Sequence, residues 1–116
     1  MKLYAWEEMD KEIMTDGIAR RFIAGEKAMV AQLYFAKGAI VPLHHHEAEQ
    51  LTYILEGALK FALEGREVVV HRGEVLHIPS NVPHSAEAME DTLDLDIFSP
   101  LRMDWINKQD DYLRRK

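Results

Sequence analysis

Three consecutive histidines stand inside a segment of strand-like composition, 41–53, which reads VPLHHHEAEQLTY. Side chains two residues apart on a strand point to the same side, so His44 and His46 share a face and His45 points away. Two neutral imidazoles converging from one strand can hold a divalent metal ion such as zinc, iron, nickel or copper. Gln50 has the same parity if the strand continues, and its amide carbonyl is then a third, weaker ligand. A polar surface, or a pair of histidines that only form hydrogen bonds, is the competing interpretation.

A second group of chemically useful side chains lies in the alternating stretch LDLDIF, 93–98. The apolar residues of this stretch share one side, and Asp94, Asp96 and Phe98 share the other. Simple alternation puts the leucines in the core and the aspartates in water, which is the better prediction for Asp94. Phe98 does not suit a fully solvated face. A barrel resolves the conflict if its inner side lines a polar pocket and its outer side is covered.

The composition restricts the classes of function. The chain of 116 residues has 14 Lys and Arg against 20 Asp and Glu, a net charge of −6, and no cysteine. This charge argues against nucleic-acid binding, and the missing thiols exclude disulfides and cysteine nucleophiles. No apolar run approaches the roughly 20 residues that span a membrane, and the N-terminal segment lacks the apolar stretch of a signal peptide. We therefore expect a soluble, cytoplasmic protein.

Glycine and proline punctuate the chain at short intervals, and the segments between them are rich in Val, Ile, Leu, Tyr and Phe. Short strands separated by turn signals indicate an antiparallel sandwich or barrel. Gly65 is placed for a hairpin turn. The tail, 103–116, has apolar residues at near-helical spacing and predicts a short helix or ordered arm. The expected strands lie in 27–36, 49–55, 58–63, 66–71, 74–79 and 91–98.

Two spaced patterns connect the histidines to distant turns. The first reads Gly-x5-His-x-His-x3-Gln-x6-Gly and the second Gly-x5-Pro-x4-His. They resemble the two motifs of the cupin superfamily, at about 38–57 and 73–88. The resemblance implies an all-β fold, the double-stranded β-helix or jelly-roll barrel with a short C-terminal helix or arm, as a single domain over 1–116. It also implies one divalent metal ion (Zn, Ni, Mn or Fe) with these ligands: His44, His46, Gln50 and His84.

The sequence departs from the cupin motifs in two places. Gln50 stands where most metal-binding cupins have Glu, and Asn81 stands where the second motif often has Gly, although Asn tolerates left-handed backbone. Three imidazoles and an amide are all neutral, so the metal keeps its full charge; this favours an anionic ligand and Lewis-acid chemistry over oxygen activation. In the competing interpretation, Gln50 has lost metal affinity and the barrel is an empty binding module. His71 and His77 match no ligand position, so we expect them to be structural or exposed.

The stretches HHHEAEQLTYILEG, IPSNVPHSAEA, FSPLRMDW and YLR, within about 4–115, resemble the small single-domain cupins of pectin and alginate breakdown, the KdgF type. That resemblance implies an enzyme that opens and ketonises 4,5-unsaturated monouronates. It places Asp96 as the catalytic proton shuttle, Phe98 against the sugar and Arg102 on the substrate carboxylate. A surface ion pair of Arg102 with Asp104 or Glu90 is the alternative role for that residue.

Three functions remain open at this point: the uronate enzyme, a non-enzymatic cupin that binds a sugar or acid, and a cupin oxygenase. Fold alone does not decide among them. The expected partner is a small anionic sugar, and we expect neither nucleic acid nor membrane as a partner. A small barrel exposes sheet edges, and the resemblance also implies a homodimer, which we place at the N-terminal strands. The sequence does not distinguish galacturonate-derived from mannuronate-derived substrates.

Overall fold

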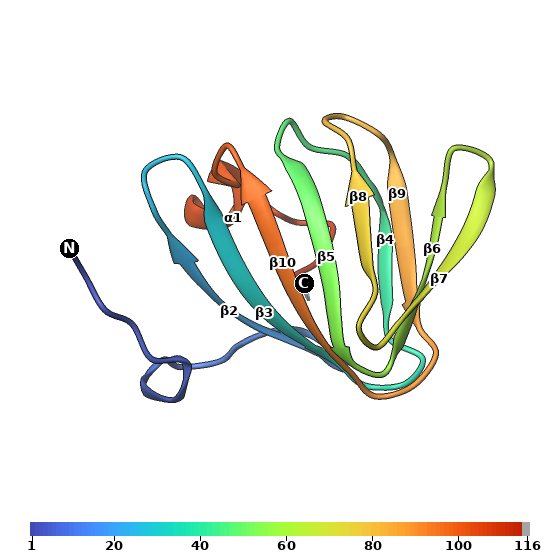
Figure 1. Cartoon of the computed structure of the whole chain (residues 1–116), viewed down its shortest axis with the longest axis horizontal. Helices are drawn as coiled ribbons and strands as arrows, with labels where there is room; N and C mark the ends of the chain where they lie inside the picture. The colour runs from blue at the N-terminus through green and yellow to red at the C-terminus, as the bar shows by residue number, and fades with distance from the viewer. Residues whose placement is uncertain (115–116) are drawn as a thin grey trace.

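The fold is built from two antiparallel β-sheets that face each other, as the computed structural model of the chain shows for residues 1–114 (Figure 1). The larger sheet has the strand order β1-β2-β3-β10-β5-β8, and the smaller one has the order β4-β9-β6-β7. Strands distant in sequence thus become neighbours, as β3, β10 and β5 do. The predicted all-β jelly-roll barrel with a short C-terminal helix is confirmed.

The strands follow the sequence segments rich in β-branched and aromatic residues. All six segments predicted to be strands are strands, and the remaining ones are β1, β2, β4 and β9. The strands are β1 (Glu12–Thr15), β2 (Ile18–Ala24), β3 (Met29–Phe35), β4 (Ile40–His44), β5 (Glu49–Glu56), β6 (Ala58–Leu63), β7 (Arg66–His71), β8 (Val75–Ile78), β9 (His84–Ala88) and β10 (Thr92–Ser99); the helices are the 3-10 turn η1 (Trp6–Glu8) and α1 (Met103–Ile106).

The core lies between the inner faces of the two sheets, where burial alternates along each strand as the period of two requires. Strand β3 has every second side chain buried, from Met29 to Phe35, and β5 and β10 repeat the pattern. At one end of this core the inner residues become polar: Gln50 and Thr52 on β5, and Asp94 and Asp96 on β10, are all buried. The sheets therefore bring a polar group into an otherwise apolar interior.

Two turns confirm expectations that rested on backbone conformation. Glu64 and Gly65 both have positive φ, 51° and 76°, and join β6 to β7 as a hairpin, since this turn type favours Gly. Asn81 has φ 63°, the left-handed conformation that Asn tolerates. Its backbone N–H donates to the carbonyl of His46 at 2.8 Å. The turn before β9 thus holds the loop that carries His46.

The chain folds back after β10 and packs its tail against the larger sheet. Helix α1 buries Trp105 against Phe98 and Phe22. Further on, the buried Asp110 accepts a hydrogen bond from Arg20 of β2 at 2.7 Å. Breaking such a buried ion pair costs about 3–5 kcal/mol because one charge is left without a partner. This pair therefore fixes the tail, whose last two residues, 115–116, lie outside the described residues.

The histidine segment does not continue as one strand to Gln50, so the condition for their shared parity is not met. Strand β4 ends at His44, and β5 begins at Glu49 in the other sheet, so Gln50 does not share a strand with the histidines. Between them, 45–48 form the connection that crosses from one sheet to the other. Of the helices in the described part of the chain, none is long and apolar enough to cross a membrane.

Candidate metal centre

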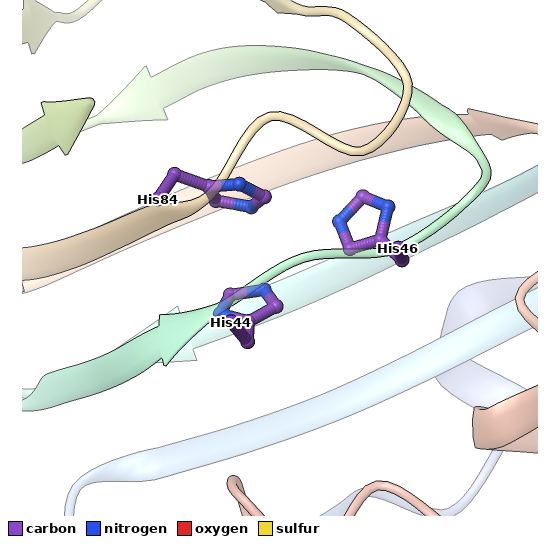
Figure 2. Close-up of side chains that lie close together, drawn as sticks. All are labelled: His44, His46 and His84. Atoms are coloured by element: carbon purple, nitrogen blue, oxygen red, sulfur yellow. The ribbon is translucent and has the colours of Figure 1, made fainter. Parts of the chain in front are cut away.

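Three histidines from both cupin-like motifs meet at one end of the barrel (Figure 2). His44 is the last residue of β4 and is paired across the sheet with His84, the first residue of β9. His46 lies in the connection that follows β4. One nitrogen from each ring lies within 4.8 Å of the others. His45 is exposed and takes no part in the cluster, as strand parity predicted.

Each of the three rings has its Nδ1 fixed by a backbone carbonyl. The distances are 2.8 Å from His44 to Pro42, 2.7 Å from His46 to Ala48 and 2.8 Å from His84 to Val82. A carbonyl oxygen only accepts, so each Nδ1 carries the proton and each Nε2 presents a lone pair.

The Nε2 atoms of His46 and His84 are buried without a hydrogen-bond partner among the described residues. Buried polar atoms are seldom left unpaired, and such an exception calls for an explanation. Three lone pairs held close together match the donor set of a divalent transition metal. The residues present therefore fit such an ion.

Burial keeps these histidines neutral. Loss of hydration lowers the pKa of His44 to about 3 and that of His46 to about 4, and it also lowers the pKa of His84. The charge of Arg102 lowers all three further. Because a metal binds only the deprotonated ring, no proton has to be removed at neutral pH before a metal binds.

Gln50 reaches the same pocket from β5, the strand predicted over 49–55, and not from the strand that carries His44. Its side chain is 5 % exposed and lines a cavity of about 40 Å³ with His44 and His84. Its Nε2 donates to Thr52 Oγ1 at 2.7 Å, and Thr52 donates to Asp96 Oδ1 at 2.8 Å. A hydrogen-bonded chain thus connects Gln50 to a buried acid.

Asp94 and Asp96 form a buried pair of carboxyl groups on β10, with exposures of 1 % and 5 %. The prediction that Asp94 lies in water is wrong: the aspartates face the cavity, and the apolar residues of 93–97 lie on the outer face, half-buried or exposed. Burial raises the pKa of Asp94 well above its ordinary value, and the charge of Asp96 raises it further. Burial also raises the pKa of Asp96, although hydrogen bonds from Asp94 and Thr52 oppose that rise.

Arg102 and Phe98 also line the cavity. The Arg102 guanidinium lies 5.0 Å from the ring centroid of Phe98. It forms the predicted alternative ion pair with Asp104, through Nε at 2.9 Å and Nη2 at 2.7 Å, and Nη2 also donates to the Tyr112 hydroxyl at 2.7 Å. Arg102 is 2 % exposed, so this pair is not a surface contact. Arg102 and His46 also line an open hollow of about 310 Å³, which provides an approach to the histidines from solvent.

Comparisons with known proteins agree with this geometry. Residues 32–99 match the family model described as the cupin domain. The chain belongs to the cupin family. It is 31% identical over 104 residues to the pectin degradation protein KdgF of Dickeya dadantii, covering 87% of this chain and 90% of that one.

Two solved structures are also similar to this cupin. The structure of KdgF from Halomonas sp. has a TM-score of 0.83 at 31% identity, covering 90% of this chain and 99% of the other. An RmlC-like cupin from Shewanella frigidimarina has a TM-score of 0.84 at 26% identity, covering 90% and 96%. The similarity to KdgF therefore spans nearly the whole barrel and not only the histidine motifs.

The cupin brings all seven predicted site residues to one end of the barrel, while His71 and His77 are exposed and pair with Glu74 and Glu49. Sequence reasoning missed Thr52 and Tyr112. Thr52 has the parity of Gln50 on β5, so its position on the inner face was available from alternation. Tyr112 stacks on His44, with ring centroids 4.2 Å apart. The alternation of polar and apolar residues in the sequence contains no signal for that contact.

Proposed function

We propose that this cupin is a metal-dependent enzyme that opens and ketonises 4,5-unsaturated monouronates from pectin or alginate breakdown. The observation that supports it most is the convergence of one nitrogen from each of three histidines, two of which line a pocket together with an acid and an arginine. Similarity to a pectin degradation protein over 87% of the chain supports the class of substrate. The proposed ligands of the divalent ion are His44, His46, Gln50 and His84.

A divalent ion bound there supplies Lewis-acid chemistry toward the carboxylate and oxygen atoms of the substrate. Its identity (Zn, Ni, Mn or Fe) is not fixed by three imidazoles and an amide, which accept several divalent ions. The neutral ligand set leaves the positive charge of the ion uncompensated, and Arg102 adds another positive charge beside the histidines. The pocket therefore favours an anionic sugar.

We assign proton transfer to Asp96. Ring opening removes the proton of the anomeric hydroxyl, breaks the bond between the anomeric carbon and the ring oxygen, and leaves an aldehyde and an enol. The enol becomes a ketone when its O–H proton is lost and a proton is added to carbon. Every proton removed is returned, so one carboxyl group can serve both steps. The raised pKa of Asp96 suits that task because it makes the carboxyl group a better proton acceptor than an exposed aspartate.

Arg102 and Phe98 complete the proposed substrate site. The guanidinium fork suits a carboxylate, and in this structure the carboxylate of Asp104 already uses its Nε and Nη2. We propose that the substrate carboxylate binds the guanidinium of Arg102 and that Phe98 packs against the sugar and excludes water.

The test follows the ultraviolet absorbance of the conjugated double bond in pectin-derived and alginate-derived monomers, with oxygen measured in parallel. The proposal expects the absorbance to fall without oxygen consumption in metal-loaded protein. Asp96→Ala should abolish turnover at saturating metal while metal content is retained, and His46→Ala should lose both. Unchanged absorbance with both monomers would support the non-enzymatic binding protein, and oxygen uptake would support an oxygenase.

A further inference from the structure

Gln50, Thr52 and Asp96 form one continuous hydrogen-bonded chain across two neighbouring strands. Thr52 on β5 lies directly opposite Asp96 on β10, and Gln50 lies opposite Phe98 in the same register. Thr52 is completely buried, and Gln50 and Asp96 are each 5 % exposed. Side chains this well buried do not exchange their partners for water. The direction of the hydrogen bonds in the chain is therefore fixed by the three residues.

The direction follows from the single hydroxyl proton of Thr52. Asp96 Oδ1 accepts that proton at 2.8 Å, and a hydroxyl has no second proton to donate. The oxygen of Thr52 is then left as an acceptor toward Gln50, so the group of Gln50 that faces it, at 2.7 Å, must be the NH₂. The amide also contributes a hydrogen bond to Asp96 itself. Both contacts hold the NH₂ end of the Gln50 amide toward Asp96, so the carbonyl oxygen of the amide points the other way.

The orientation of this amide decides whether Gln50 can serve as a ligand. The carbonyl oxygen of an amide has lone pairs that can bind a cation, whereas its NH₂ has only donors. The two ends have nearly the same size and shape, so packing alone does not choose between them. Hydrogen bonds must make that choice, and Thr52 is the side chain that forms the shortest one with the amide.

We propose that Thr52 is a positioning residue for the metal, whose hydroxyl orients the Gln50 amide so that the carbonyl oxygen is presented to the three histidines. The inference rests on the proposed function in one respect, the use of Gln50 as a ligand. It extends that function by adding an outer residue that connects the metal ligand to the acid Asp96. Outer partners that fix a ligand in this way typically change metal affinity by about 10–100-fold.

The experiment measures cobalt(II) affinity by chelator competition, together with the visible absorption spectrum of the bound cobalt. Thr52→Val keeps the size and branching of the side chain but removes the hydroxyl. We expect it to weaken cobalt binding by about 10–100-fold and to change the spectrum. Thr52→Ser keeps the hydroxyl and should retain both the affinity and the spectrum of the wild-type protein. Thermal melts of the metal-free variants check that each is folded, and Thr52→Ala provides a second variant without the hydroxyl.

A double-mutant cycle shows whether the effect passes through Gln50. Gln50→Leu removes the carbonyl ligand, so adding Thr52→Val to it should cause no further loss of cobalt affinity. An equal loss in both backgrounds would overturn the inference, as would a Thr52→Val protein that binds cobalt with wild-type affinity. These results are independent of turnover. Wild-type protein that binds cobalt but leaves both uronates unchanged refutes the proposed reaction, whereas the cobalt measurements alone decide the role of Thr52.

Discussion

Replacing Gln50 with Glu, the residue that most metal-binding cupins have there, should destabilise the metal-free protein. Thr52 Oγ1 would then face acceptors on both sides with only one proton to donate. The two hydrogen bonds are 2.7 Å and 2.8 Å long, so the new carboxylate oxygen would lie within about 5.5 Å of Asp96 Oδ1. Two like charges at that separation repel by about 3 kcal/mol at an effective dielectric constant of about 20.

The total cost has an upper bound because the new carboxyl can take up a proton. Protonating a glutamate with an ordinary pKa of about 4.3 costs about 4 kcal/mol at pH 7. The repulsion and the unsatisfied acceptor together, about 1–3 kcal/mol for the latter, reach that bound. We therefore expect Gln50→Glu to lower the unfolding free energy of the metal-free protein by about 3–4 kcal/mol, which for a chain of this size lowers Tm by on the order of 15 °C.

Bound metal should reverse much of that loss, because a divalent ion stabilises the carboxylate that the metal-free pocket disfavours. The assay is thermal unfolding of wild-type, Gln50→Glu and Gln50→Leu proteins, each with and without metal. Gln50→Leu is the uncharged control: it loses the two hydrogen bonds of the amide, about 1 kcal/mol each, and should gain no more from metal than the wild type does. Two results would contradict the direction we describe for the hydrogen bonds from Gln50 through Thr52 to Asp96. One is a metal-free Gln50→Glu protein with the Tm of the wild type, and the other is a Tm of Gln50→Glu that metal raises no more than it raises that of the wild type.

Four further predictions concern protons and assembly. Because the pKa values of His44 and His46 are about 3 and about 4 in the folded protein, metal affinity in chelator competition should stay flat from neutral pH down to about pH 5. Ordinary histidines, with a pKa of about 6.5, would weaken it tenfold per ring by about pH 5.5. The same shifts mean that the unfolded chain takes up protons first, so the metal-free protein should lose stability as the pH falls from about 6.5 toward 4. The raised pKa of Asp94 has the opposite sign: the folded state keeps a proton that the unfolded state releases, so its contribution to stability falls as the pH rises above about 4. The Tm of Asp94→Asn relative to that of the wild type should therefore be higher at pH 8 than at pH 4.5. An equal Tm difference at both pH values would contradict a proton held on Asp94. Finally, we propose a homodimer through the N-terminal strands, where Ile13 of the edge strand β1 is 73% exposed; Ile13→Lys should convert a dimer to a monomer in analytical ultracentrifugation, and a monomeric wild type would refute the proposal.

Much of the barrel could be predicted because its signals are local. Strand β3 alternates cleanly, the turn at Gly65 needs positive φ, and Asn81 replaces a glycine without loss of the turn. The three histidines were found because their spacing is fixed within two short motifs. The contacts between these elements join residues that are distant in sequence, and the periodicity of a single segment does not predict them. The stacking of Tyr112 on His44 depends on a tail that returns to the barrel after a further helix.

Asp94 shows the limit most clearly. Alternation divides 93–98 into two faces but does not say which face is inside, because both faces of a barrel strand can be partly covered. Simple alternation predicts the apolar side in the core, whereas the barrel alternative puts the polar side inside, and the inner side does carry Asp94, Asp96 and Phe98. The burial of Asp96 is tolerated because the neighbouring strand supplies a donor, Thr52, at the matching register position. That register is set by the pairing of β5 with β10 and cannot be predicted from the sequence of either strand alone.

The same pocket suggests why a glutamine stands at position 50. The inner face already holds two carboxyl groups, and burial raises the pKa of both. A third would compete with Asp96 for the Thr52 hydroxyl and would raise the pKa of Asp96 further. A neutral amide avoids this because it adds no further negative charge to the pocket. Since Gln50 contacts both Thr52 and the acid, a substitution that strengthens metal binding there must also change the acidity of Asp96.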